Sequence, residues 1–110
     1  MKFIFNAKMM ALNWSDTLFD KCQDTYEMTT KVLDFYTDSR SNEIDMHGMI
    51  EYCDSLLLLM QDILDTSANV AEMDIDEVMR FLSDLVTALN IQSVFLETVL
   101  TPAINNMHAA

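Results

Sequence analysis

The most apolar part of the chain is residues 43–67, EIDMHGMIEYCDSLLLLMQDILDTS, with the run LLLLM at residues 56–60 near its centre. At 100° per residue, its apolar side chains cover about half of the circumference of an α-helix, more than the roughly 100° stripe of an ordinary surface helix. These side chains are Met46, Met49, Ile50, Tyr52, Cys53, Leu56, Leu57, Leu59, Met60, Ile63 and Leu64. Such a helix must be covered on more than one side, so the sequence predicts that other helices pack around residues 43–67.

The length and composition of the chain limit its fold class. The chain has 110 residues, which suits one domain with a modest core. It contains one glycine, one proline and 51% hydrophobic residues, a composition that argues against disorder and against an all-β fold rich in turns. We therefore predict a single all-α domain over residues 1–110, a small bundle of three to four helices with antiparallel hairpin connections.

Residues 14–36, which precede this stretch, have the pattern of an amphipathic helix, with apolar residues on one side and acidic residues on the other. The polar segment 37–42 follows, and Asn42 is a suitable N-cap for the next helix. Residues 1–12 form an apolar lead-in that is too short to span a bilayer and is interrupted by Asn6 and Lys8. Its spacing favours a helix, and an edge strand or a swapped arm are the alternatives.

After residue 67 the helix signals are clear at first and then lose phase. Residues 68–73 form a connection, and Asp74 with Glu77 three residues later has the pattern of a capping box before a helix over residues 75–89. We expect a break or kink at Asn90, because a straight continuation would place apolar residues on the polar side. The alternative is one long helix whose second half is covered by another protomer.

The C-terminal segment contains the proline. A new helix over residues 91–100 would have an apolar face formed by Ile91, Val94, Phe95 and Val99. Thr101 precedes Pro102, and a residue before proline resists the α conformation, so a helix is expected to end there. Alternatively, Pro102 at a first helical position would open a short last turn. We predict that residues 101–110 form a loose tail.

Charge is distributed unevenly along the chain. The net charge is -12; residues 1–42 contribute 5 - 6 = -1, and residues 43–110 contribute 1 - 12 = -11. Direct binding to nucleic acid is disfavoured, because clustered lysine and arginine supply affinity for phosphates. A basic protein surface would instead be attracted by this negative field. The alternative is that the acidity serves only solubility.

One side of the predicted helix over residues 43–67 carries charge of a single sign. Its acidic residues surround Leu58, and an apolar side chain ringed by charge is a common arrangement in interface hot spots. The alternatives are that Leu58 completes a helix buried on all sides, or is an isolated exposed leucine. Including two acids of the next helix, the predicted partner-binding residues are Glu51, Asp54, Leu58, Asp62, Asp65, Asp76 and Asp84.

The sequence contains no convincing catalytic, cofactor or metal site. Cys22 and Cys53 lie on apolar stripes of predicted helices, as buried structural thiols do, and indicate a reducing cytoplasm. Glu43, His47 and Glu51 follow one another at four-residue intervals, which we interpret as a surface coincidence because no supporting shell of ligands is evident. We therefore expect a non-enzymatic cytoplasmic protein without cofactor or metal.

These observations support one function and one alternative. The first is a small acidic protein that inhibits or neutralises a basic partner, including a nucleic-acid-binding one, as immunity proteins and phage anti-defence proteins do. The alternative is an oligomeric helical chaperone, or a module that binds small molecules or peptides in a Met-rich apolar groove, since ten methionines give an adaptable surface. We expect a homodimer or higher homo-oligomer because apolar residues exceed what a few short helices can cover, and we expect no membrane association.

Overall fold

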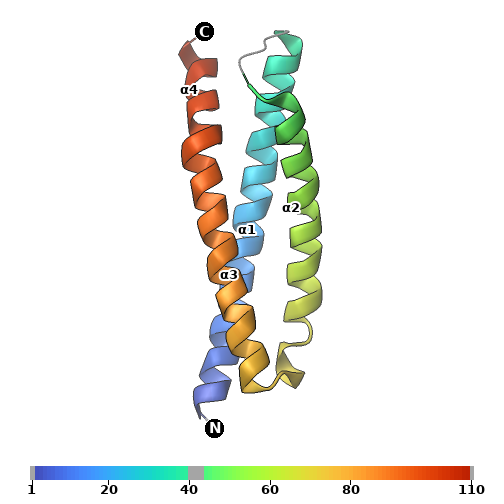
Figure 1. Ribbon diagram of the computed structural model, residues 1–110, viewed down its shortest axis with the longest axis vertical. Coiled ribbons are helices and arrows are strands. Elements are labelled where there is room, and N and C mark those ends of the chain that lie inside the picture. Colours follow the sequence, from blue (N-terminus) through green and yellow to red (C-terminus); the bar gives the residue numbers. More distant parts are fainter. Residues whose placement is uncertain (1, 40–43, 110) are drawn as a thin grey trace.

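The computed structural model describes residues 2–39 and 44–109, and these residues form helices and short connections without a β-strand (Figure 1). The elements are α1 (Lys2–Asp38), α2 (Met46–Ser67), a 3-10 turn η1 (Val70–Glu72), α3 (Ile75–Phe95), a π-helical segment η2 (Leu96–Leu100) and α4 (Thr101–Ala109). The last three form one continuous rod that runs antiparallel to α2, as α2 does to α1. The predicted all-α bundle with antiparallel hairpins is therefore confirmed.

Helix α1 is the central element of an elongated molecule with principal extents of 57 × 20 × 16 Å. It packs along both α2 and α3, and in Figure 1 it lies between them in the upper half and crosses α3 lower down, whereas the backbones of α2 and α3 barely approach each other. Small buried residues on α1, such as Ala11 and Ser15, allow two neighbours to come close. The buried Ser15 and Thr29 hydroxyls donate to carbonyls one turn earlier, so burial leaves neither of them unsatisfied.

The apolar lead-in of residues 1–12 is the first part of α1, so the helical alternative is the one that the structure shows. Ala7 and Ala11 are buried against the rest of the bundle. Phe3 and Phe5, in contrast, remain mostly exposed.

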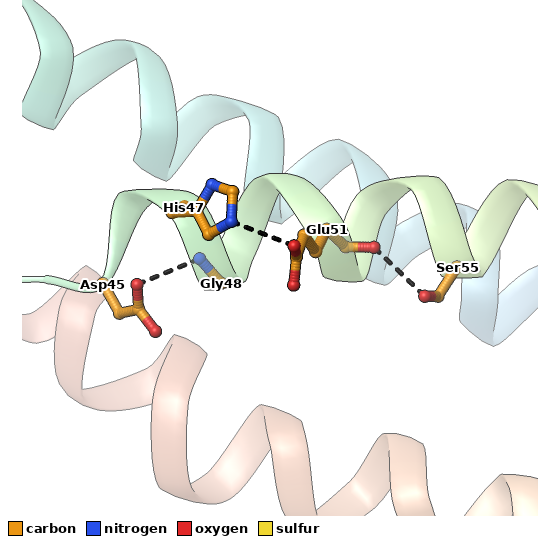
Figure 2. A network of polar contacts seen from close by, with 5 residues as sticks. All are labelled: Asp45, His47, Gly48, Glu51 and Ser55. Atoms are coloured by element: carbon orange, nitrogen blue, oxygen red, sulfur yellow. Dashed lines mark hydrogen bonds and ion pairs between the residues drawn. The ribbon is translucent and has the colours of Figure 1, made fainter.

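The start of α2 differs from the prediction. Asn42 lies outside the described residues, and the observed N-cap is Asp45, whose carboxylate accepts a hydrogen bond of 2.9 Å from the Gly48 N–H (Figure 2). A Cβ atom at residue 48 would collide with the Asp45 carboxylate, so a larger residue there would force the Asp45 side chain to move. At the other hairpin, the predicted capping box is confirmed: the Glu77 N–H donates to Asp74 Oδ1 at 2.9 Å, and Glu77 Oε1 accepts from the Asp74 N–H at 3.4 Å.

The break predicted at Asn90 is wrong, because α3 continues through it to Phe95. As a straight helix requires, Gln92 is buried, whereas Ile91 and Val94 project into solvent. The buried amide needs no break in the helix, because Gln92 Oε1 accepts a hydrogen bond of 2.9 Å from the Tyr52 hydroxyl.

The loose tail predicted for residues 101–110 is also wrong, because α4 is helical from Thr101 to Ala109. Pro102 has no N–H and its ring crowds the preceding turn, and the chain accommodates it with the π-helical turn η2, in which the Thr101 N–H donates to the Leu96 carbonyl. Packing then holds α4 in place. Ala103 is buried, and its carbonyl accepts a hydrogen bond of 3.1 Å from Tyr36 of α1.

Candidate functional site

Side chains close the seam between α2 and α3 where the first half of α2 meets the second half of α3, which is the upper half of the seam as oriented in Figure 1. Tyr52 of α2 stacks on Phe95 of α3, with ring centroids 3.7 Å apart and an interplanar angle of 16°. The same Tyr52 hydroxyl donates to Gln92. Aromatic and polar contacts therefore join the two helices here, although their backbones are well separated.

Below this contact, the seam contains smaller residues. In a pair of antiparallel helices, a step of seven residues forward along one helix is matched by a step of seven residues backward along the other helix. Starting from the pair Tyr52 and Phe95, the next layer places Leu59 opposite Ala88, and the following layer places Thr66 opposite Phe81. Ala88 occupies the position that Phe95 occupies in the layer above. Its methyl group is too small to fill the space between the helices, so the seam opens there.

The opening is a groove of about 420 Å³ between α2 and α3. Its apolar lining comes from all three long helices, including Leu18 of α1, and its charged residues come from α2 and α3. The lining residues are Leu18, Leu59, Asp62, Ile63, Thr66, Met73, Glu77, Arg80, Phe81, Asp84, Leu85 and Ala88. Apolar surface bordered by three carboxylates and one guanidinium suits an apolar ligand that also carries positive charge.

Within residues 2–39 and 44–109, no lysine or arginine forms an ion pair with a carboxylate. Among residues 2–39 and 44–109, the single ion pair joins His47 Nε2 to Glu51 Oε1 at 2.9 Å on the exposed side of α2 (Figure 2). Lys8 donates instead to the Ala71 carbonyl at 2.7 Å, and Lys21 to the Ser93 hydroxyl at 3.5 Å. Apart from the contact of Glu51 with His47, the acidic side chains of the described residues therefore have no ion-pair partner among them.

The structure brings together most of the predicted partner-binding residues. Five lie on the exposed side of α2: Glu51, Asp54, Leu58, Asp62 and Asp65. Leu58 is 70% exposed, so the alternative that it completes a helix buried on all sides is wrong. Asp62 of α2 and Asp84 of α3 both line the groove. Asp76, in the first turn of α3, is exposed but does not line the groove.

The sequence suggested an apolar groove as an alternative but did not locate it, and two of its charged residues, Glu77 and Arg80, were not among the predicted site residues. A signal was present, because Glu77, Arg80 and Asp84 share one side of a helix at spacings of three and four residues. A second signal was the small Ala88 between Phe81 and Phe95 at seven-residue intervals.

The reactive side chains of the interior are held in their neutral forms. Burial raises the pKa of the Cys22 thiol to about 11 and, with the nearby Cys22, that of the Tyr52 hydroxyl to about 12. Burial and the charge of Asp54 also raise the pKa of Cys53. Thiols of this kind are poor nucleophiles at neutral pH. Within the described residues, no three His, Cys, Asp or Glu side chains gather as a metal site would require.

By length and composition, the rod Ile75–Ala109 is the described helix that could cross a membrane. The core helices of soluble bundles pass the same criterion; in this rod, 17% of the apolar window is buried.

Comparison with known proteins adds no relative to this description. No protein-family model matches the chain, and no match is found among curated proteins or among solved structures.

Proposed function

We propose that this chain is a small acidic binding protein that docks its α2 surface on a basic protein partner and thereby inhibits or neutralises it. The observation that carries the proposal is Leu58, which is 70% exposed among the acidic residues of α2. Apolar contact at the centre would supply affinity, and the surrounding carboxylates would accelerate encounter with a positive surface. Among the described residues, no lysine or arginine pairs with these carboxylates, so the carboxylates are available to a partner.

The proposed partner class includes nucleic-acid-binding proteins, whose basic surfaces an acidic protein can block. Immunity proteins and phage anti-defence proteins are of this physical type. On this proposal the chain acts by occupying a surface, without catalysis or a cofactor, in the cytoplasm and without a membrane or direct contact with nucleic acid. The raised pKa values of Cys22 and Cys53 are consistent with structural thiols in such a role.

The groove favours a second candidate function, a peptide-binding or chaperone-like module. Its apolar lining could hold side chains of a bound segment. Met73 is the one methionine in that lining, so leucine, isoleucine and phenylalanine would provide most of the contact, rather than the methionines that first suggested a groove.

We also propose that the chain self-associates. Ile50, Leu57 and Leu64 recur at seven-residue intervals on α2, and each is about half exposed. A stripe of this kind is typical of helix pairing. Analytical ultracentrifugation at micromolar concentration should give a dimer or larger species, and Leu57→Ser should shift it toward the monomer. A wild-type monomer at that concentration would contradict self-association.

Affinity capture from the native host, at low and high salt, tests the main proposal. The wild-type protein should retain basic proteins at low salt, and Leu58→Asp or the pair Asp54→Lys and Asp62→Lys should lose them. Val86→Asp, which adds a charge to an exposed apolar site on α3, is the matched control and should retain them. Capture that is insensitive both to salt and to Leu58→Asp would refute the proposal.

A further inference from the structure

We infer that the groove between α2 and α3 receives a single amphipathic helix of the partner, with apolar residues on one side and lysines or arginines beside them. This inference rests on the proposed function, because it identifies the part of a basic partner that is recognised. It adds a contact between α2 and α3, beside Leu58 and the acidic residues that surround it on α2.

The arrangement of the helices leaves a position for another helix. Helix α1 packs on both α2 and α3, while α2 and α3 are joined in their upper half by side chains only. Below Tyr52, the space between them has an apolar floor that includes Leu18, Ile63 and Leu85. Helix bundles cover such a floor with a helix packed against its neighbours.

The length of the groove suits anchoring residues on one side of a helix. Its two layers, Leu59 with Ala88 and Thr66 with Phe81, are seven residues apart along each helix, or about 10 Å at 1.5 Å per residue. Two turns of a bound helix cover the same distance. Its residues at i, i+3 or i+4, and i+7 would then enter the groove together.

Charge decides which helix fits. Asp62 borders the groove on α2, and Glu77 and Asp84 border it on α3, against one cation, Arg80. A second copy of this chain, with a net charge of -12, would bring further carboxylates against them. A helix with lysines or arginines flanking its apolar stripe would place positive charge beside both borders.

The test uses a synthetic helix of about four turns with leucines on one side and lysines on the other. Fluorescence anisotropy of the labelled peptide should show binding to the full chain. A peptide with glutamates in place of the lysines should not bind, and a scrambled leucine–lysine peptide should bind at least about tenfold more weakly. If all three bind equally, or none binds, the inference is wrong.

Ala88→Phe places in the open layer a ring like the one that closes the layer above, and it should weaken binding at least about tenfold. Thr87→Phe adds the same ring at the neighbouring, exposed residue of α3 and should bind like the wild type. Circular dichroism checks that each variant is folded. If Ala88→Phe does not fold, Asp62→Lys with Asp84→Lys replaces it, with Asp16→Lys and Asp24→Lys on exposed α1 positions as its control.

Two further results would overturn the inference: wild-type affinity in the groove variant, or loss of peptide binding in Leu57→Ser on the other side of α2. Failure here is distinguishable from failure of the proposed function. If groove variants still capture basic host proteins while Leu58→Asp does not, the groove inference fails and the proposed function survives. If the peptide binds in the groove but the capture of host proteins changes neither with salt nor with Leu58→Asp, the proposed function fails.

Discussion

The upper and lower halves of the seam between α2 and α3 are built on the same two helices in the same register, yet one is closed and the other open. In the upper half, Tyr52 reaches Phe95 and Gln92. One heptad further along, Leu59 and Ala88 cannot bridge the same distance between the backbones, so a groove remains. A single alanine in place of an aromatic residue therefore separates a structural contact from a candidate binding surface.

The chemistry of the two halves differs as much as their shape. The closed half excludes water well enough to raise the pKa of both Cys22 and Tyr52. The open half is bordered by Asp62, Glu77 and Asp84. We expect substitutions in the closed half to alter the free energy of unfolding most, and those in the open half to alter binding most.

Tyr52→Ala should give the largest loss of stability. It removes the stack on Phe95 and leaves the buried Gln92 amide without its hydrogen-bond donor. We expect the free energy of unfolding to fall by about 3 kcal/mol, measured by urea denaturation. Tyr52→Phe keeps the ring and removes only the hydroxyl, so it should lose about 1–2 kcal/mol. Equal losses in the two variants would show that the aromatic stack does not hold the seam closed.

Alkaline pH should lower the free energy of unfolding of the protein. Burial raises the pKa of Cys22 from 9.0 to about 11 in the folded protein, so between these values the unfolded thiol ionises while the folded thiol stays protonated. The unfolded state then binds fewer protons, and stability falls as pH rises, by about 2 kcal/mol over this range.

Urea denaturation of Cys22→Ala at a series of pH values provides the control for this effect. The variant should lose less stability between pH 9.0 and about 11 than the wild type, whatever its stability at neutral pH. Identical pH dependence in the two proteins would contradict the assignment to Cys22. Tyr52, whose folded pKa is about 12, contributes in the same direction at higher pH.

Ala88→Phe should raise the free energy of unfolding, by less than Tyr52→Ala lowers it. The ring would bury apolar surface in the groove, which outweighs the lower helix propensity of phenylalanine. We expect a gain of about 1 kcal/mol in the free energy of unfolding, measured by urea denaturation. A loss of stability would mean that the groove is too shallow to hold an aromatic side chain.

Local patterns in the sequence were enough to predict the helices and several of their ends. The all-α class, the capping box of Asp74 and Glu77 and the end of α2 near Ser67 all depend on residues close together in the chain. Helical periodicity alone also placed Leu58 among the acidic residues of α2, whereas its exposure, which periodicity left open, comes from the structure.

The errors arose where a distant residue decides the local structure. Gln92 enters the core because Tyr52, 40 residues away in sequence, donates a hydrogen bond to it, and no pattern around Asn90 reveals that. The helical C-terminus depends on α1, where Tyr36 bonds Ala103 across 67 residues. The groove required the register of α2 against α3, which periodicity within each helix does not fix.

The smallest expected effect concerns the acidic border of the open half. Asp62 lies one turn before Asp65 on α2 and borders the groove together with Asp84 of α3, so Asp62→Asn should relieve repulsion between like charges. We expect a gain of about 0.3 kcal/mol, or about 1–2 °C in Tm by calorimetry. The gain should vanish near 1 M salt, where the Debye length is about 3 Å. A gain that persists at high salt would have a cause other than charge. A loss of stability would indicate that the Asp62 carboxylate makes a stabilising contact, and the acidic border of the groove would then not reduce the stability of the protein.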